Sequence, residues 1–433
     1  MNATHVMTRR LGLLAAGFAG LLALAACGSG FSGGGSTSAG GATGGSTAGG
    51  GSTAAGGGSL DVLIGSSGDA ETNAVDDAVA AWSQQSGTQA TVRNASNLVQ
   101  ELSQGFASGQ PPDLFYASAD QFEGYAANGS LFAYGDQLSA VSDFYPSLVS
   151  QFTFDGKLYC APKDFSTLAL IINTDDWTAA GLTDADVPTT WDQLATVAKK
   201  LTSNGRVGLA FSGEYARIGA FFAEAGGRMI SEDGKTAVVA SPENVQALTF
   251  VKDQINAGSF AFASAVGAGW GGEAFGTHKS SMTIEGNWIA GAMTHDYPDI
   301  KYRVVPLPAG PGGKGTLQFT NCWGIPTDSD QHDAAVSLVE FLTSTEQQLK
   351  FAQAFGVMPS VQSAAAGFKE QFPQFAAFVD SAGFAQNVVT AQGSSAVISD
   401  FNAQLESLAS GDPQAILTSV QTNLQAALDQ NRK

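Results

Sequence analysis

Residues that could support catalysis are few and scattered along the chain. Three histidines lie beyond the N-terminal region, at His278, His295 and His332. None has a metal-ligand spacing such as H-E-x-x-H. No cysteine lies beside a candidate base in the manner of an activated nucleophile. These patterns predict neither a metal centre nor a thiol-based active site.

Three motifs match known ligand or catalytic signatures only in part. A G-x-S-x-G match at 30–34 lies in a glycine-rich coil rather than between a strand and a helix, which that signature requires. The stretch 312–315 resembles a phosphate loop but has no Ser or Thr after its lysine. Asp328, Asp330 and Asp333 lack the glycine and terminal glutamate of a calcium loop. The many acidic residues leave a carboxylate pair for glycoside cleavage as an alternative. The motifs together favour a binding protein over an enzyme.

The charge of the chain is strongly acidic. The formal net charge is −19, and no basic stripe is present, so we expect no nucleic-acid partner. Hydrophobic residues make up 44% of the chain, enough for a sizeable core in the body at 60–433. Its length suits two ordinary domains.

The N-terminus has the pattern of an exported lipoprotein. Arg9 and Arg10 precede an apolar run at 11–26, which is too short for a comfortable membrane span. The run ends in Leu-Ala-Ala-Cys, which resembles the bacterial lipobox, so residues 1–26 are predicted to be a signal peptide and Cys27 a lipidation site. A plain signal peptide with an incidental cysteine is the alternative. The twin arginines leave the export route open.

The segment 27–59 consists almost entirely of Gly, Ser, Thr and Ala. It cannot bury enough apolar surface to offset the entropy of ordering it. We therefore predict a flexible tether with a root-mean-square span of about 30 Å. Together with Cys27, this tether predicts a body held by lipid at the extracellular face of the cell membrane.

The body alternates strand and helix patterns, as a parallel α/β sheet requires. Ser67, Tyr116 and Asp120 follow the first strands, at the end where such sheets bind ligands. Two cysteines remain, Cys160 and Cys322, and their spacing alone leaves a disulfide and two separate buried thiols equally open. Strands are predicted at 61–65, 88–93, 113–116, 168–173, 207–211, 281–285 and 302–307, and helices around 75–82, 98–106, 191–201, 216–225 and 335–342.

Several stretches resemble the extracellular solute-binding proteins of sugar ABC transporters, the family that includes the maltose-binding protein. The resemblance runs in order over 60–433. The stretches are "PPDLFYASADQFEGYAANGSLFAYGD" (111–136), "GKLYCAPKDFSTLALIIN" (156–173), "EYARIGAFFAEAGG" (214–227), "AFGTHKSSMTIEGNW" (274–288), "VPLPAGPGGKGT" (305–316) and "CWGIPTDSD" followed by "AAVSLVEFLTSTEQQ".

The resemblance implies a two-lobe periplasmic-binding-protein-like fold of type II, with doubly wound α/β sheets joined by a hinge. Lobe 1 is expected at 60–163 and 323–370, and lobe 2 at 164–322 and 371–433. The ligand is expected in the cleft between them. Because both remaining cysteines would lie on neighbouring crossover strands, the resemblance also predicts a disulfide between Cys160 and Cys322.

The resemblance implies a sugar site built from aromatic planes and hydroxyl acceptors. Trp288 is the predicted platform, Trp323 lines the cleft or belongs to the core, and Trp270 lies at the rim. Asp120 is either a hydroxyl acceptor or a helix cap, and Asp164 either an acceptor or an ion-pair partner of Lys163. The remaining candidates are Ser67, Tyr116, Gln121, Glu214, Tyr215, Glu285 and Asn287.

Two departures concern which sugar is bound: Tyr116 lies one residue from the family's aromatic position, and Gln121 replaces the arginine of maltose binders. The function implied is a monomeric, non-catalytic binding subunit that delivers a mono- or oligosaccharide to an ABC permease, without cofactor or metal. The alternatives are a cell-surface glycoside hydrolase and a binder of polyols or glycerol phosphodiesters.

Overall fold

The computed structural model describes residues 59–203 and 205–430. The predicted signal peptide, Cys27 and nearly all of the predicted tether lie outside the described residues. Strands and helices alternate along the chain, which confirms the predicted α/β class. The strands are β1 (Leu60–Ile64), β2 (Ala90–Asn94), β3 (Leu114–Ser118), β4 (Thr153–Phe154), β5 (Lys157–Leu158), β6 (Cys160–Asn173), β7 (Val207–Phe211), β8 (Phe260–Phe262), β9 (Ser280–Gly286), β10 (Tyr302–Val305), β11 (Thr316–Gly324) and β12 (Ala385–Asn387).

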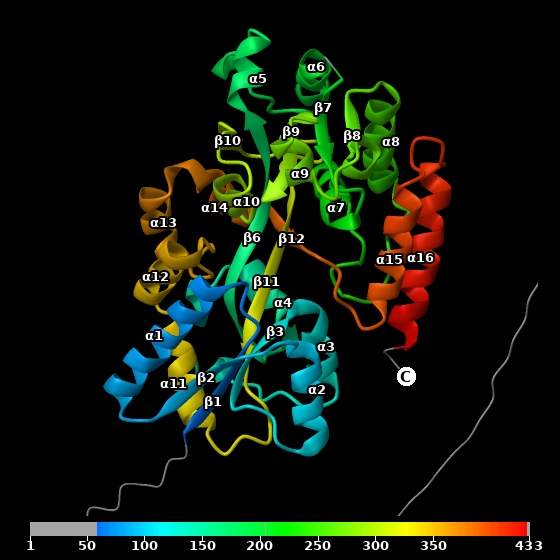
Figure 1. Ribbon diagram of the computed structural model, residues 1–433. Helices are drawn as coiled ribbons and strands as arrows, with labels where there is room; N and C mark the ends of the chain where they lie inside the picture. The colour runs from blue at the N-terminus through cyan, green and yellow to red at the C-terminus, as the bar shows by residue number, and fades with distance from the viewer. Residues whose placement is uncertain (1–58, 204, 431–433) are drawn as a thin grey trace, which may run out of the picture. The chain divides into compact units, whose positions relative to one another are not determined.

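The helices flank these strands in Figure 1. They are α1 (Asp69–Ser86), α2 (Leu98–Ser108), α3 (Ala119–Ala127), α4 (Pro146–Gln151), α5 (Thr174–Ala179), α6 (Trp191–Leu201), α7 (Tyr215–Ala225), α8 (Pro242–Asn256), α9 (Gly271–Gly276), α10 (Ile289–His295), α11 (His332–Leu342), α12 (Thr345–Phe355), α13 (Ala365–Gln371), α14 (Ala376–Asp380), α15 (Ser394–Leu405) and α16 (Pro413–Gln430). Short 3-10 turns lie at Gly135–Gln137, Val141–Asp143, Asp184–Asp186, Ala263–Val266, Gln362–Ala364, Pro373–Phe375 and Ala382–Phe384.

Local sequence explains the helix boundaries. In α6, the Thr190 side chain caps the first turn by accepting a hydrogen bond from the Gln193 backbone N–H. In α1, Val75, Val79 and Trp82 are buried on one face, as their spacing predicts. The helix α1 therefore presents one apolar stripe to the core.

The main sheet has the strand order β2-β1-β3-β11-β6-β9-β7-β8, with β10 added to β6 and β12 added to β11. The pairs β1–β2, β1–β3, β7–β8 and β7–β9 are parallel. Two long antiparallel strands, β6 and β11, join these parallel groups (Figure 1). The carboxyl ends of the parallel strands, where ligands bind in such sheets, therefore lie on either side of the β6–β11 pair.

The sequence pattern predicted a strand only from 168, but β6 is continuous from Cys160 to Asn173. Pro162 is accommodated because the pairing register shifts beside it: Cys322 pairs with Pro162, whereas Asn321 pairs with Asp164. Lys163 is the additional residue of this β-bulge. The bulge thus places Lys163 and Asp164 at the middle of the crossover pair.

The disulfide between Cys160 and Cys322 is present, which confirms the pairing implied by the resemblance. Its two Cα atoms are 5.5 Å apart, and Cys160 lies two residues along β6 from Pro162, the residue that pairs with Cys322 on β11. It therefore ties the two crossover strands together at one end of their paired segment.

Five apolar clusters form the core of the described residues, and the two largest lie in different parts of the sheet. One surrounds Leu168, Leu170 and Ile172 of β6 and includes buried residues of α6, α7, α8, α15 and α16. The other surrounds β1 and includes buried residues of α1, α11 and α12. Each parallel strand group thus has its own core, while β6 and β11 run between them.

One carboxyl lies inside the first core without a cation. Glu224 in α7 is 2% exposed and accepts a 2.5 Å hydrogen bond from Trp191 Nε1. Burial raises the pKa of Glu224 well above its usual range, against the smaller opposing effect of the Trp191 hydrogen bond. The folded state therefore holds this proton more tightly than the unfolded chain does.

Glu224→Gln is expected to make stability less dependent on pH. A raised folded-state pKa gives stability that is present at low pH and is lost as pH rises through that pKa. Glutamine keeps the acceptor for Trp191 but does not ionise. As pH rises, the free energy of unfolding of wild type should therefore fall relative to that of the variant, by up to about 1.4 kcal/mol per unit of difference between the folded and unfolded pKa values of Glu224. Urea unfolding at pH 5 and pH 8 measures this, and parallel pH profiles for the two proteins would contradict it.

Candidate functional site

One group of candidate residues gathers around Lys163. Its Nζ lies 3.0 Å from Glu71 Oε1, contacts Asp164 Oδ2, and stands 4.4 Å from the centre of the Tyr116 ring. Glu71 Oε2 in turn accepts hydrogen bonds from the Ser67 N–H and hydroxyl, at 2.8 and 2.7 Å. The ion-pair alternative for Asp164 is therefore what the structure shows, and Ser67 is held at the same place.

Burial and charge act in opposite directions on these groups. Burial raises the pKa of Asp164, and the neighbouring Lys163 opposes the rise without cancelling it. Burial also acts to raise the pKa of Glu71, but Lys163 and the Ser67 hydrogen bonds lower it overall. Burial acts to lower the pKa of Lys163, yet the surrounding carboxylates raise it, so this lysine stays charged.

A second group of candidate residues gathers around Arg217 of α7. Its guanidinium lies 3.0 Å from Glu214 Oε1 and 2.5 Å from Glu285 Oε2, and its Nε donates to the Ile284 carbonyl. Burial raises the pKa of Glu285, and Arg217 opposes this rise. Arg217 did not emerge from the sequence analysis, although a charged residue in the apolar stretch "YARIGAFF" was a usable signal.

Trp288 lies directly on this second group. Its Nε1 donates a 2.9 Å hydrogen bond to Glu285 Oε2, and the Arg217 guanidinium stands 5.3 Å from the ring centre. The Phe319 ring meets it nearly at right angles, 5.5 Å away. The indole is nevertheless 39% exposed. Among the described residues, Val99 is the only other large apolar side chain that is exposed.

The sequence Glu-Gly-Asn-Trp at 285–288 explains this arrangement. Glu285 holds the indole N–H, and Gly286 lets the ring lie against the backbone, since a Cβ there would come within 2.2 Å of Trp288 Cζ3. Asn287 donates a 2.8 Å hydrogen bond to the Gly356 carbonyl at the end of α12. Side chain and backbone thus fix the orientation of an aromatic plane that stays open on one side.

The two groups share one face of the crossover pair. Asn321 pairs with Asp164 and Phe319 with Ser166, so these four positions lie on the same face of β6 and β11. Phe319 carries the contact to Trp288. Asp164 therefore lies two residues along β6, roughly 7 Å, from Ser166, the residue that pairs with Phe319.

A model of the family described as bacterial extracellular solute-binding protein matches residues 77–421. The chain belongs to this family. Among curated relatives, a binding protein of Brucella abortus is 26% identical over 230 residues, covering 50% of this chain and 54% of the relative. An uncharacterized lipoprotein of Streptomyces antibioticus is 24% identical and covers 60% of each chain. The alignments thus span about half the length of the first of these relatives.

Solved structures show the same fold. A cyclic α-maltosyl-1,6-maltose binding protein of Arthrobacter globiformis superposes with a TM-score of 0.78 at 21% identity, covering 87% of this chain and all of the other. A glycerophosphocholine complex of UgpB from Mycobacterium tuberculosis superposes at 0.71 and 20% identity, covering 87% of this chain and 100% of the other. The predicted periplasmic-binding-protein-like fold is therefore confirmed.

Two aromatic candidates of this solute-binding protein lie in its core. Trp323 is 1% exposed and Tyr116 is 3% exposed, and their ring centres are 4.7 Å apart. Their register on β11 and β3 directs both rings toward α1. The structure therefore places Trp323 in the core, and Tyr116 beneath Lys163, rather than on an open face.

Three further candidates lie apart from Trp288. Trp270 is half-buried and packs over Gly272, where a Cβ would meet its ring at 2.1 Å. Asp120 is exposed in the first turn of α3 and lines an open groove with Gln121 and Tyr125. Gln121 also accepts a hydrogen bond from Ser118 and donates one to Tyr125. The structure shows no contact of these residues with the Trp288 group.

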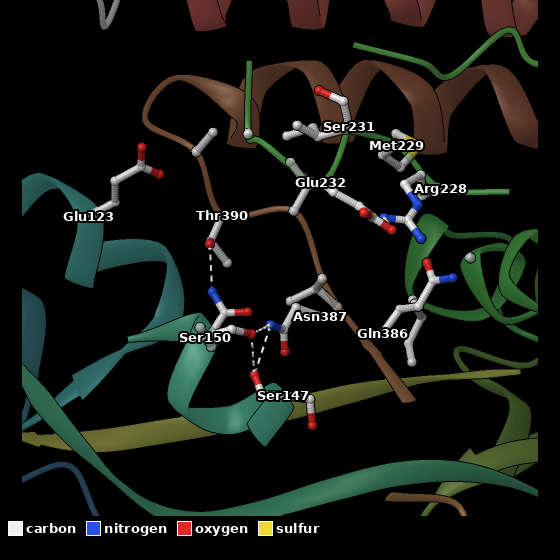
Figure 2. A pocket seen from close by; sticks show the side chains of 18 of the residues that line it. Glu123, Ser147, Ser150, Arg228, Met229, Ser231, Glu232, Gln386, Asn387 and Thr390 are labelled. Atoms are coloured by element: carbon white, nitrogen blue, oxygen red, sulfur yellow. Dashed lines mark hydrogen bonds and ion pairs between the residues drawn. The ribbon is translucent and has the colours of Figure 1, made fainter. Parts of the chain in front are cut away.

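A cavity lies elsewhere, beside β12 (Figure 2). Its volume is about 520 Å³, and its lining comes from α3, α4, α7, the loop at 228–234 and the segment 385–391. Tyr215 is the one predicted ligand residue that lines it. Tyr215 is buried, with its ring centre 6.4 Å from that of Phe401.

The polar side chains of this cavity largely bond to one another. Asn387 donates to the Ser147 carbonyl and to Ser150 Oγ, as Figure 2 shows. Gln151 donates to Thr390 Oγ1. Gln318, which pairs with Asn387, donates to Asn387 Oδ1 at 2.6 Å. The Trp288 platform, with an open aromatic plane beside carboxylates, is therefore the better candidate for the ligand site.

Neither a metal site nor a membrane-spanning helix is found among residues 59–203 and 205–430. Within these ranges the structure shows no group of three or more His, Cys, Asp or Glu side chains placed to hold a metal ion. No helix of the same ranges has the length and apolar character needed to span a bilayer.

Proposed function

We propose that this solute-binding protein serves an ABC importer and binds a mono- or oligosaccharide on the exposed face of Trp288. The observation that carries the proposal is an indole plane that is 39% exposed and held by Glu285, Arg217 and Phe319. A sugar ring offers an apolar C–H face to such a plane and a rim of hydroxyls to neighbouring acceptors. Glu214 and Asp164 supply carboxylate oxygens nearby.

The charge of the site favours a sugar over a glycerol phosphodiester. Lys163 and Arg217 each already contact two carboxylates of the protein, so neither cation is free to bind a phosphate. An acyclic polyol has no ring face for Trp288. The similar solved structures support the fold, but the ligands that they bind assign no role to any residue of this chain.

We further propose the lobe boundaries expected above, 60–163 with 323–370 and 164–322 with 371–433, with a hinge in the crossover pair. The bulge at Lys163 and the packing of α15 and α16 with α7 and α8 support this division. Closure would bring the Lys163 group toward the Trp288 group around the ligand. We propose a monomer that acts without catalysis and without a cofactor, with the permease as its protein partner.

A thermal-shift screen tests the function. Neutral and amino saccharides, polyols and glycerol phosphodiesters are added singly, with turnover assayed in parallel. A ligand at 100 times its dissociation constant adds about 2.7 kcal/mol of stability, a measurable rise in melting temperature. We expect a saccharide to raise it and to be recovered intact. Stabilisation by phosphodiesters alone, or cleavage of the sugar, would contradict the proposal.

We also propose that Cys27 carries the lipid that anchors the protein at the extracellular face of the membrane. The lipobox pattern and the lipoprotein relative support this. Cys27→Ala is expected to move the protein from the detergent phase to the aqueous phase in a phase-partitioning assay, or to leave it uncleaved. Unchanged partitioning of a processed Cys27→Ala protein would show that the anchor is elsewhere.

A further inference from the structure

Strand pairing shows which parts of β11 each proposed lobe holds. On the side away from β6, β11 pairs with β12 over Thr316–Gln318 and with β3 over Asn321–Gly324. The strand β12 belongs to the second proposed lobe and β3 to the first. Phe319 and Thr320 lie between these two ladders, and among the described strands they pair only with β6. These two residues are therefore the part of β11 that neither lobe holds by strand pairing.

The strand β6 has a matching gap opposite these residues. On the side of the second lobe, its pairing with β9 begins at Leu168. On the side of the first lobe, the Phe165 N–H donates a 3.1 Å hydrogen bond to the Met358 carbonyl. Ser166, the partner of Phe319 on β11, lies between these two attachments. Neither lobe therefore constrains the Ser166–Phe319 pair through a neighbouring strand.

The burial of the crossover pair follows the same division. On β11, only Phe319, Thr320 and Asn321 are not buried, and on β6 only Asp164 and Ser166 are not buried. Partly exposed backbone with few neighbours deforms more readily than a fully paired strand. The rotation of the proposed closure is therefore expected to concentrate at the Ser166–Phe319 pair.

The ring of Phe319 reaches from this pair to the ligand platform. Its centre lies 5.5 Å from that of Trp288, and the two ring planes meet at 78°. This is the edge-to-face geometry in which aromatic rings attract each other. The Phe319 ring also packs against the core that surrounds β6 in the second lobe. A rotation of the β11 backbone at residue 319 would therefore change the contact between the two rings.

We propose that Phe319 is a positioning residue that couples a ligand on Trp288 to the rotation of the lobes. This inference rests on the proposed function and adds the residue that links binding to closure. A ligand shifts a protein toward the closed form only as far as it binds that form more tightly. In this proposal, rotation brings the Phe319 ring to the position that orients the Trp288 plane for stacking, so stacking and rotation favour each other.

Closure is measured on the full chain by pulsed electron resonance between two spin labels. The labels are placed at Gln104→Cys in α2 and Lys199→Cys in α6, which are exposed positions in different lobes. Each single variant alone controls for any label at Cys27. We expect the most stabilising saccharide of the screen to shorten the distance between the labels in wild type.

Phe319→Ala is expected to weaken saccharide affinity about three- to tenfold, as the loss of one aromatic pair predicts. At saturating saccharide it should also show less than about half of the wild-type change in label distance. Phe319→Tyr keeps the ring and should restore both values. A saturated Phe319→Ala protein that closes as fully as wild type would overturn the proposal.

A double-mutant cycle tests whether Phe319 acts through Trp288. Phe319→Ala is made in wild type and in Trp288→Ala, and titration calorimetry measures saccharide affinity in all four proteins. In the Trp288→Ala background we expect Phe319→Ala to cost less than about twofold, because no platform remains to be positioned. An equal cost in both backgrounds would show that the two rings act independently, which contradicts the proposal.

Two further variants separate positioning from support of the fold. Phe319→Leu keeps apolar volume without a ring, so it should lose the coupling at a nearly unchanged melting temperature, and it serves if the alanine variant does not fold. Phe250→Ala is the matched control, because Phe250 is half-buried in α8 and its ring stacks on Trp191 at 4.6 Å. It should change neither affinity nor closure. An equal loss in this control would assign the effect to packing and refute the proposal.

The outcomes separate this inference from the function it rests on. If wild type binds a saccharide and closes, but the Phe319 variants close as fully, the coupling is wrong and the function stands. If wild type binds a saccharide without a change in label distance, the proposed closure and this inference are wrong, while saccharide binding stands. If no saccharide of the screen stabilises the protein, the proposed function fails and this inference fails with it.

Discussion

Trp288→Ala is expected to weaken saccharide binding at least thirtyfold. Large aromatic side chains at the centre of a binding site commonly contribute about 2 kcal/mol or more, and about 1.4 kcal/mol corresponds to tenfold in affinity. The ring is 39% exposed, so its removal should change the melting temperature little. Titration calorimetry and a melting curve on the same preparation measure both effects.

Two controls sharpen this comparison. Trp288→Phe keeps an aromatic plane and should lose less affinity than the alanine variant. Val99→Ala truncates the other exposed large apolar side chain, on α2, and should change neither affinity nor stability. If Trp288→Ala retains full affinity but unfolds at a much lower temperature, the residue supports the fold and the site lies elsewhere.

The second large effect concerns the disulfide. Replacing both Cys160 and Cys322 by serine is expected to lower the free energy of unfolding by about 2–5 kcal/mol, because the bond closes a loop between residues 162 apart. Urea unfolding of the variant, and of wild type with and without reductant, measures this. Reductant should shift the wild-type midpoint and leave that of the variant unchanged. If the urea midpoint of wild type is the same with and without reductant, under conditions that cleave the bond, the prediction is refuted.

The sequence predicted the elements whose patterns are local. The strand at 207–211 and the helix at 191–201 coincide with β7 and α6, because their apolar periodicity and the Thr190 cap act within a few residues. The long strand β6 was not predicted over its full length. Its first half contains Pro162 and Lys163, which are tolerated only because the bulge against β11 accommodates them.

The candidate site was predictable in part. The resemblance to the family singled out Trp288, whose exposed ring agrees with a platform role that stays a prediction. The ion pair of Asp164 with Lys163 was one of two alternatives for Asp164. The contact of Lys163 with Glu71 joins residues 92 positions apart, and that of Arg217 with Glu285 joins residues 68 apart. Such pairs depend on tertiary structure that composition and spacing do not specify.

The orientation of aromatic side chains was the other feature of the site that the sequence did not predict. Tyr116 was predicted at the ligand edge and Trp323 either in the cleft or in the core, but both lie within strands, and their cross-strand pairing directs both rings into the core. A shift of one residue would direct them to the opposite face. Which rings remain available to a ligand is therefore decided by register, and Trp288 remains available because it follows β9 rather than lying within it.

A crystal structure with the most stabilising saccharide of the screen tests the central claim most directly, because it locates the ligand independently of any mutation. The account predicts a sugar ring stacked on the exposed face of Trp288, with polar contacts to Glu214 or Asp164. A sugar bound in the cavity of Figure 2, against Asn387 and Gln386 and without contact to Trp288, would contradict it.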